Sequence, residues 1–322
     1  MTSAFDSVLL VGFGGPTPGC CRRHADCPGE AYCYVENVVG GRAGSADRIR
    51  EVAAHYAHFG GFSPFSYFSQ KQAGALETAL DAAGKPLPVY VGFRFWTPYV
   101  REALAEMARR GLRRALAIVL APHRAKVSWE AYQGAARAAR EEIGAGAPEV
   151  EFLDASWFDH PAFIEAVADC VRRAAGRMGA GRFERARLIF TAHSIPVPMA
   201  KVSPYEREFS RTAVLAAEAL GVKRFEIGYQ SSASDVPGTW LEPDVTDVVR
   251  KAAGEGARDV VLAPIGFICD HVEVLYDLDE EAREAAEEAG LGYFRAPTVG
   301  THPAFIRMLR DLVLARAAGG AA

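Results

Sequence analysis

The chain has 322 residues, of which 50% are hydrophobic and 24% are charged, close to the averages of soluble globular proteins. At about 150 residues per domain, this length predicts two domains. The 36 basic and 40 acidic side chains leave a formal net charge of −4, which excludes the basic excess typical of nucleic-acid-binding proteins. Apolar runs stay well short of the roughly 18 residues of a membrane helix, and Asp6 stands where a signal peptide would carry Lys or Arg. We therefore expect a cytoplasmic protein without a transmembrane segment.

The first half of the chain alternates short β-branched runs with longer stretches of helical period. The predicted strands are residues 7–13, 87–93, 115–121 and 150–153. The predicted helices are residues 46–59, 69–83, 99–110 and 129–143. This alternation is typical of βαβ units around a parallel sheet.

The second half repeats the alternation. Its predicted strands are residues 187–192, 224–229, 259–265 and 292–295. Its predicted helices are residues 161–178, 206–220, 245–255, 272–289 and 303–318. The fold class is therefore α/β, and we expect two domains, residues 1–150 and 151–322, each a parallel sheet flanked by helices, with a cleft between them. Functional groups in such sheets gather beyond the carboxyl ends of the strands.

A glycine-rich turn, residues 12–16, follows the first predicted strand. Its spacing is not G-x-G-x-x-G, and Pro16 removes an amide donor where a phosphate cradle needs one, so nucleotide binding is disfavoured. Glycines also leave room for a flat ligand to approach the backbone, because no side chain stands in the way.

A row of carboxylates follows the strand at residues 259–265. Glu273, Asp277 and Glu281 are four residues apart, so on a helix they share one face. A solvated acidic face is the common reason for such a row. Its start at a strand's carboxyl end favours a second interpretation, in which hard oxygen ligands pass a divalent cation along the row.

His193 directly follows the predicted strand at residues 187–192, in the sequence TAHSIP. A histidine at such a position is often a hydrogen-bonded structural residue. It can also accept protons or bind a metal near neutral pH. If the two halves face each other across a cleft, His193 and Glu273 meet there, and an imidazole with a carboxylate is a ligand set that suits Fe(II).

Seven motifs together resemble one known family. They are LLVGFGGP (9–16), ENVVGGR (36–42), HYAHFGGFSPF (55–65), TAHSIP (191–196), YQSS (229–232), PGTWLEPDV (237–245) and PIGFICDHVEVLYDLD (264–279). On these motifs the sequence resembles the ferrochelatases, which insert Fe(II) into a porphyrin in haem biosynthesis. The resemblance spans nearly the whole chain and implies two Rossmann-like domains with the porphyrin clamped between them.

The resemblance also implies roles for individual residues. His193 and Glu273 match the family's invariant pair, and Asp277 and Glu281 match its outward line of acidic residues. We expect these four side chains to meet Fe(II), and His193 and Glu273 to be the catalytic pair.

Five further residues are expected to bind the porphyrin. Arg42 and Ser63 match positions that face propionates, and a guanidinium pairs well with carboxylates. Phe13, Trp240 and Phe267 are predicted walls that distort the macrocycle. Some bacterial relatives carry a Tyr in place of Phe13, whose oxygen meets the metal, so here only aromatic packing remains. Likewise Phe95 stands where some relatives have an outer metal-binding His.

Within the family the chain is more similar to the short bacterial coproporphyrin III enzymes than to the protoporphyrin IX enzymes, which remain an alternative. A cobalt or nickel chelatase using His193 and His271 is a second alternative, and a non-catalytic porphyrin or haem carrier is a third. We expect a monomer whose partners are a porphyrin and ferrous iron.

Four of the six cysteines fall between residues 20 and 33. Cys20, Cys21, Cys27 and Cys33 form the pattern CC-x5-C-x5-C, which fits no common zinc spacing and lies in a segment that family members usually make shorter. Three interpretations stay open, namely a [2Fe–2S] cluster, a zinc ion, or thiols that are reduced or paired in disulfides. The other two, Cys170 and Cys269, are predicted to be buried structural thiols.

Overall fold

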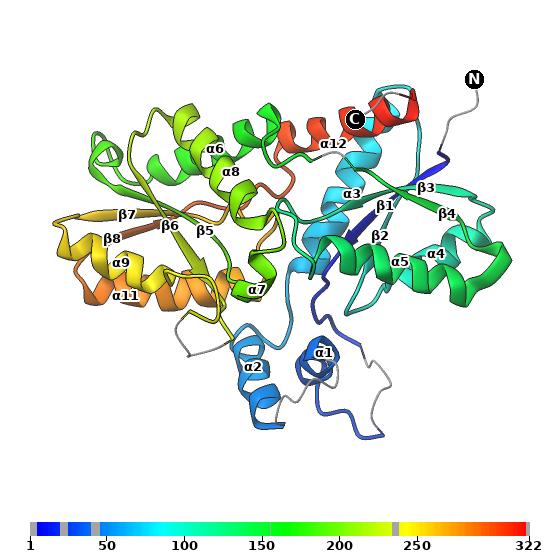
Figure 1. Ribbon diagram of the computed structural model, residues 1–322, viewed down its shortest axis with the longest axis horizontal. Helices are drawn as coiled ribbons and strands as arrows, with labels where there is room; N and C mark the ends of the chain where they lie inside the picture. The colour runs from blue at the N-terminus through cyan, green and yellow to red at the C-terminus, as the bar shows by residue number, and fades with distance from the viewer. Residues whose placement is uncertain (1–4, 20–24, 40–45, 155, 234–237, 320–322) are drawn as a thin grey trace. The chain divides into compact units, whose positions relative to one another are not determined.

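The structure is a computed structural model that describes residues 5–19, 25–39, 46–154, 156–233 and 238–319. The chain forms two compact units. Unit 1 comprises residues 1–120, 131–153 and 313–322, and unit 2 comprises residues 121–130 and 154–312. Each unit holds one four-stranded sheet in which every pairing is parallel (Figure 1). The predicted α/β class with two parallel sheets is thus confirmed.

The sheet of unit 1 has the strand order β2-β1-β3-β4. Its strands are β1 (Ser7–Gly12), β2 (Val89–Phe93), β3 (Arg114–Val119) and β4 (Glu149–Phe152). Every residue of β1 is buried, because this inner strand is covered on both faces and therefore needs a continuous apolar sequence. The helices of unit 1 are α1 (Glu30–Val39), α2 (Ala46–His58), α3 (Phe65–Ala82), α4 (Val100–Arg109), α5 (Trp129–Ile143) and the 3₁₀ turn η1 (Gly144–Gly146).

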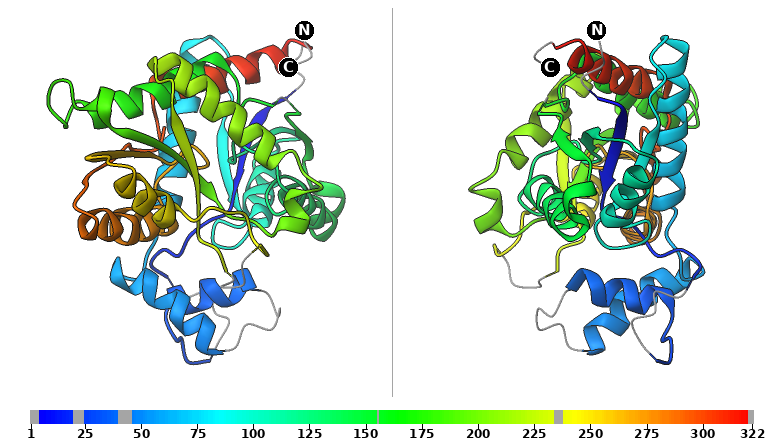
Figure 2. Two further views of the ribbon diagram at one scale, coloured as in Figure 1. Left: turned by 60° about the vertical axis from the view of Figure 1, so that its left-hand side comes forward. Right: turned by 90° about the vertical axis from the view of Figure 1, so that its right-hand side faces the viewer.

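Helix α1 lies in the cysteine-containing segment, for which the sequence analysis gave no element. It packs against α2 (Figure 2). Cys33, Tyr34 and Val35 form its buried face, and the Tyr34 hydroxyl donates to the Gly14 carbonyl at 2.9 Å. The helix therefore attaches the segment to the glycine-rich turn after β1.

The sheet of unit 2 has the strand order β6-β5-β7-β8. Its strands are β5 (Arg187–His193), β6 (Phe225–Gln230), β7 (Asp259–Ala263) and β8 (Gly292–Arg295). Strand β7 ends earlier than predicted because Pro264 has no N–H to continue the ladder. The helical elements up to β7 are α6 (Pro161–Ala175), η2 (Phe183–Arg185), α7 (Val197–Ala200), α8 (Tyr205–Leu220) and α9 (Val245–Gly254). The last helix, α12 (Pro303–Ala317), contributes residues to both units.

The prediction of one continuous α-helix over residues 272–289 is wrong in its middle. The segment consists of α10 (Val272–Val274), a π-helical stretch η3 (Leu275–Glu281) and α11 (Ala282–Glu288). A π-helix bonds i to i+5 and has more residues per turn than the 3.6 of an α-helix. Side chains four residues apart are therefore rotated less around the axis of a π-helix than around that of an α-helix. The predicted acidic row is correspondingly straighter.

The core of unit 2 includes the inner side of this helical segment. Val274 and Leu278 are fully buried against the helix α9 and the strands β5 and β7. Cys170 and Cys269 are also buried, as predicted, at 3% and 1% exposure. Burial raises the pKa of the Cys170 thiol to about 11, which makes this thiol a poor nucleophile.

Candidate active site

His193, Glu273 and His271 come together in unit 2. His193 is the last residue of β5, and Glu273 follows the neighbouring strand β7, so both lie at the carboxyl edge of the sheet. His193 Nε2 is 3.6 Å from Glu273 Oε2, and His271 Nε2 is 3.3 Å from the same oxygen. The predicted pairing of His193 with Glu273 is therefore a contact within one unit.

A backbone carbonyl sets the tautomer of His193. Its Nδ1 is hydrogen-bonded to the carbonyl oxygen of Ser194. A carbonyl only accepts, so Nδ1 carries the hydrogen, and in the neutral form of the ring the lone pair lies on Nε2, which faces Glu273. The Tyr205 hydroxyl donates to the His193 carbonyl at 2.8 Å and fixes the backbone at this point.

Glu273 is held as a carboxylate. Burial by itself would raise the pKa of this carboxyl group, but the hydrogen bond from His271 and the positive charges that His193 and His271 carry when protonated lower the pKa to about 2. Two electron-pair donors, Glu273 Oε2 and His193 Nε2, thus face each other across 3.6 Å. A proton or a cation placed between them is attracted by both.

Asp277 lies one step along the acidic row and bonds to the end of β6. It accepts hydrogen bonds from the Ser231 hydroxyl and from Gln230 Nε2, the latter at 3.3 Å. Ser231 has a φ of +62°, a left-handed conformation that is uncommon for a residue other than glycine. Burial and the charges of Glu273 and Glu281 raise the pKa of Asp277 to about 8, against the lowering effect of these hydrogen bonds.

Glu281 is the exposed end of the row. Partial burial, followed by the charges of Asp244 and Glu284, raises the pKa of this carboxyl group. The row therefore runs from the half-buried Glu273 through Asp277 to solvent at Glu281.

Two predicted wall residues of unit 2 lie next to the histidines. The Phe267 ring is 4.7 Å from the His271 ring, centroid to centroid. Trp240 forms an antiparallel bridge with Pro196, three residues after His193. Both aromatic side chains are half-buried, so each keeps a surface that a ligand can contact.

The predicted binding residues of unit 1 surround the glycine-rich turn. The Phe13 ring is 4.7 Å from the Phe95 ring. Ser63 is buried, and its hydroxyl accepts a hydrogen bond from the Phe65 amide at 3.3 Å, at the start of α3. A Cβ on Gly15 would lie 2.6 Å from the Cβ of Ser63, so the close approach of the two segments requires glycine. Arg42 lies outside the described residues.

Comparison with known proteins shows the family. The model of the family described as Ferrochelatase matches residues 34–317. The chain is 39% identical to a coproporphyrin III ferrochelatase of Nocardia farcinica, over 96% of this chain and 88% of that relative. It is also 39% identical to a ferrochelatase of Rhodopirellula baltica, over 97% of this chain and 86% of that relative.

The chain belongs to the ferrochelatase family. It is therefore a metal chelatase that inserts Fe(II) into a porphyrin in haem synthesis. A solved structure of SirB from Bacillus subtilis with Fe3+ is similar in fold, with a TM-score of 0.57 at 13% identity, over 97% of each chain. In the part of the chain that the structure describes, no helix is both long and apolar enough to cross a membrane.

Of the residues that bond to this candidate site, Gln230 and Ser231 belong to the YQSS motif but were given no role from the sequence, and Tyr205 was not singled out. Tyr205, Gln230 and Ser231 bond directly to His193 or Asp277. The position of Gln230 and Ser231 at the carboxyl end of β6 was the available signal. Tyr205 begins the helix α8, and no sequence pattern relates it to His193.

The predicted cysteine site is only partly described. Cys27 is exposed and Cys33 is buried at 1% exposure, while Cys20 and Cys21 lie outside the described residues. Within the described ranges, no group of three or more His, Cys, Asp and Glu side chains is arranged to hold a metal ion.

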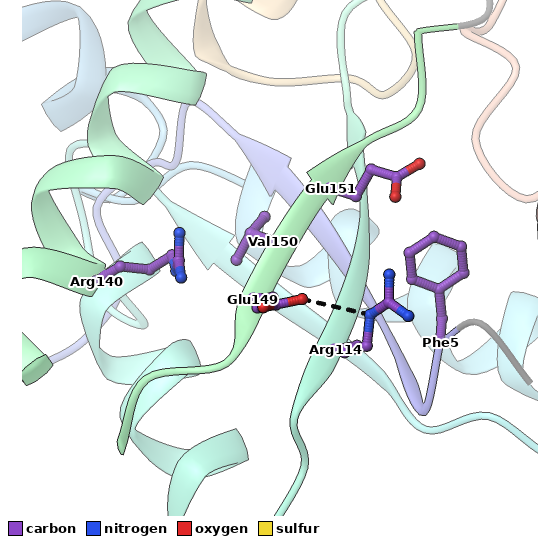
Figure 3. Close-up of a pocket in the computed structure, with 6 residues that line it drawn as sticks. All are labelled: Phe5, Arg114, Arg140, Glu149, Val150 and Glu151. Carbon is purple, nitrogen blue, oxygen red and sulfur yellow. Dashed lines mark ion pairs between the residues drawn. The ribbon is translucent and has the colours of Figure 1, made fainter. Parts of the chain in front are cut away.

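A cavity of about 250 Å³ lies in unit 1 at the amino ends of β3 and β4 (Figure 3). Its lining residues are Phe5, Arg114, Arg140, Glu149, Val150 and Glu151. Arg114 Nε is 3.4 Å from Glu149 Oε2, so these two charges already compensate each other. Ligands of parallel sheets usually bind at the carboxyl ends of the strands, the opposite edge of the sheet from this cavity.

Proposed function

We propose that His193 and Glu273 are the catalytic pair for Fe(II) insertion and that coproporphyrin III is the porphyrin. The arrangement of His193 Nε2 against Glu273 Oε2, 3.6 Å apart with the imidazole hydrogen held on Nδ1, carries this proposal. It supplies a base and an adjacent negative charge at one point, which proton removal from a pyrrole requires.

The chemistry exchanges two protons for one dication. A free-base porphyrin carries two pyrrole N–H groups, and Fe(II) bonds to all four nitrogens after both protons have left, so the charge balances. His193 accepts a proton at Nε2, and the imidazolium that forms is stabilised by the carboxylate of Glu273. The proton then leaves through Glu273, Asp277 and Glu281, which returns His193 to its neutral form so that it can accept the second pyrrole proton, and Fe(II) reaches the porphyrin along the same row of oxygen ligands.

The aromatic residues distort the ring in this proposal. A planar macrocycle holds its nitrogen lone pairs in the ring plane, and a saddled one turns them toward one face. Trp240 and Phe267 of unit 2 supply flat apolar contacts for this distortion, and Phe13 of unit 1 has the same role. Arg42 and Ser63 bind propionates. Binding energy from these contacts is used to strain the ring toward its reactive shape.

The names of the similar proteins support coproporphyrin III. The relative from Nocardia farcinica is a coproporphyrin III ferrochelatase, as is one from Mycolicibacterium smegmatis at the same 39% identity. Coproporphyrin III has four propionates and protoporphyrin IX has two, so the two substrates differ in the anionic groups that a binding surface meets.

The test is anaerobic Fe(II) insertion assayed side by side with coproporphyrin III and protoporphyrin IX. We expect the porphyrin absorption bands to change to those of the metallated product, with the higher kcat/KM for coproporphyrin III. A higher kcat/KM for protoporphyrin IX contradicts the substrate. Binding of either porphyrin without any band shift after iron is added is the result expected of a carrier, and contradicts the catalytic role.

The remaining proposals concern the cysteines and the state of the molecule. Three interpretations of Cys20, Cys21, Cys27 and Cys33 can be separated by analysing protein purified without oxygen. A [2Fe–2S] cluster predicts iron and sulfide, a zinc ion predicts zinc, and metal-free thiols predict none of the three. The protein is proposed to be a monomer in the cytoplasm. Sedimentation tests the oligomeric state, and cell fractionation tests the location.

A further inference from the structure

The guanidinium of Arg295 contacts two carboxylates that lie on either side of Glu273 in the sequence. Its Nε and Nη2 are each 2.7 Å from an oxygen of Asp279, and its Nη1 and Nη2 are each 3.2 Å from an oxygen of Asp270. Paired hydrogen bonds of this kind fix the direction of both partners as well as their distance. The side chain is only 12% exposed, so solvent screens these interactions little.

Both carboxylates belong to the segments that carry the site. Asp270 directly precedes His271 and is three residues before Glu273. Asp279 lies within η3, between Asp277 and Glu281. One side chain from β8 thus connects the loop after β7 with the helical stretch that holds the acidic row.

Two other residues near the end of β8 contact the same segments. The Tyr293 hydroxyl donates to the Leu278 carbonyl in η3, and the Thr298 hydroxyl donates to Asp270 Oδ1 at 2.9 Å. A π-helix interrupts the regular i→i+4 bonding, so donors from outside help to satisfy its carbonyls. Tyr293 and Arg295 are two apart on β8 and therefore point to the same face of the sheet.

The contact of Arg295 with Asp270 and Asp279 matters because this region carries many acidic side chains. The twelve residues 270–281 contain six acidic side chains, namely Asp270, Glu273, Asp277, Asp279, Glu280 and Glu281. Arg295 compensates two of them, and Arg283 adds a longer contact of 3.6 Å to Asp279. Without the guanidinium of Arg295, Asp270 would lose its ion-pair partner, and the like charges would push the two segments apart.

We propose that Arg295 is a positioning residue for Fe(II) insertion, which holds Glu273 and Asp277 at a fixed spacing through Asp270 and Asp279. The inference rests on the proposed roles of Glu273 and Asp277. Arg295 reaches the acidic row through the two aspartates, so its removal changes how the row binds Fe(II) and leaves the porphyrin contacts of Trp240 and Phe267 in place.

The test compares Arg295→Met and Arg295→Lys with the unaltered protein, measuring kcat and the separate KM values for Fe(II) and porphyrin. Residues that orient metal ligands typically contribute 10- to 100-fold to metal affinity or activity. We therefore expect Arg295→Met to raise the KM for Fe(II) by on the order of 10-fold, with the KM for porphyrin unchanged. Arg295→Lys keeps the charge but loses the fork, so its KM for Fe(II) is expected to fall between the two.

Arg182→Met is the matched control. Arg182 forms an ion pair with Asp259, which is 7% exposed and is the first residue of β7, at the opposite end of that strand from the site. Its loss is expected to lower stability without changing the KM for Fe(II). If Arg295→Met changes the KM values for Fe(II) and porphyrin together, Arg295 is a structural residue and the inference is wrong. The same conclusion follows if it changes neither KM value, which is the result expected of Arg182→Met.

Two further comparisons keep the test decisive. If Arg295→Met does not fold, Arg295→Lys and Thr298→Val are used, and an unchanged KM for Fe(II) in both overturns the inference. The variants His193→Ala and Glu273→Gln are assayed in parallel. If they retain the full rate, the proposed function fails. If they lose it while the Arg295 variants keep a normal KM for Fe(II), only the inference fails.

Discussion

At His193, a single backbone carbonyl determines which ring nitrogen is available for chemistry. The Ser194 carbonyl holds the hydrogen on Nδ1, and Nε2 is left with a lone pair directed at Glu273. His271, two residues before Glu273, contacts the same carboxylate oxygen at 3.3 Å. Glu273 therefore stays ionised although it is partly buried, and it stabilises positive charge on either imidazole.

Substitution of either member of this pair is expected to stop metal insertion. His193→Ala removes the base and Glu273→Gln removes the charge that stabilises its protonated form, so each should lower kcat for Fe(II) insertion by at least about 100-fold. The measurement is the initial rate of porphyrin metallation under anaerobic conditions.

A histidine elsewhere in unit 2 provides the control. His160 caps the helix α6 by accepting a hydrogen bond from the Ala162 amide, and asparagine can do the same. His160→Asn should therefore keep the full rate. Full activity in both His193→Ala and Glu273→Gln would show that neither side chain takes part in the reaction.

At the scale of elements, the strands were predictable and the helical segment after β7 was not. Apolar β-branched runs define the eight strands to within about two residues of their observed ends, because each inner strand must be apolar on both faces. The π-helical stretch of residues 275–281 depends on contacts from β8, by Tyr293 and Arg295, which are distant in sequence. A local sequence pattern cannot predict contacts with residues that are distant in sequence.

The site was predictable to a similar degree. The strand-end positions of His193 and Glu273 and the spacing of the acidic row placed the main residues. The tautomer of His193, the contact of His271 with Glu273 and the bond from Ser231 depend on where side-chain atoms lie to within a few tenths of an ångström, and the sequence does not contain this information. Helix α1 was missed although Glu30 after Pro28-Gly29 is a recognisable start signal.

The exit of β7 tolerates no side chain at Gly266. A Cβ there would lie 2.6 Å from the Cβ and 2.7 Å from the Cα of Ala192, in the adjacent strand β5. Gly266→Ala should therefore lower the free energy of unfolding by about 1–3 kcal/mol, the usual cost of overpacking. Chemical denaturation measures it.

A second glycine gives the comparison for Gly266. Gly254 ends the helix α9, and a Cβ there would meet no atom within 4 Å. Gly254→Ala should leave stability unchanged or raise it slightly, because alanine has the higher helix propensity. Equal free energies of unfolding for Gly266→Ala and Gly254→Ala would mean that the loop at Gly266 accommodates the added Cβ without loss of stability.

At the scale of the whole molecule, stability depends on pH through a buried histidine that stays uncharged in the folded protein. His123 is 2% exposed, and its Nε2 is 3.0 Å from the hydroxyl of Thr212, which donates to the Phe158 carbonyl. The Thr212 hydrogen is thus used elsewhere, and His123 must donate from Nε2. Burial lowers the pKa of His123 from 6.5 to about 3, so the folded protein holds this ring uncharged.

The contribution of His123 to stability is expected to depend on pH. Above pH 6.5 the ring is neutral in both the folded and the unfolded chain, and the contribution is complete. As the pH falls from 6.5 toward 3, the unfolded chain takes up a proton that the folded chain does not, so stability falls by about 1.4 kcal/mol per pH unit.

The measurement is the free energy of unfolding at several pH values in the unaltered protein and in His123→Asn. The variant lacks the titrating ring, so the difference between the two proteins should change with pH in this range. Glu208, whose carboxylate accepts from the Arg124 amide beside His123, is present in both and cancels in the comparison. A difference that is constant between pH 7 and pH 5 would contradict the prediction.

The chain segments that make up unit 1 determine the order in which this unit can be completed during synthesis. Its sheet comes from residues 1–153, but the unit also includes residues 313–322 at the end of the chain. Chains emerge from the ribosome amino end first, and domains generally fold as they become complete. Unit 1 therefore begins its synthesis first and receives residues 313–322 only after residues 154–312 of unit 2 have been made.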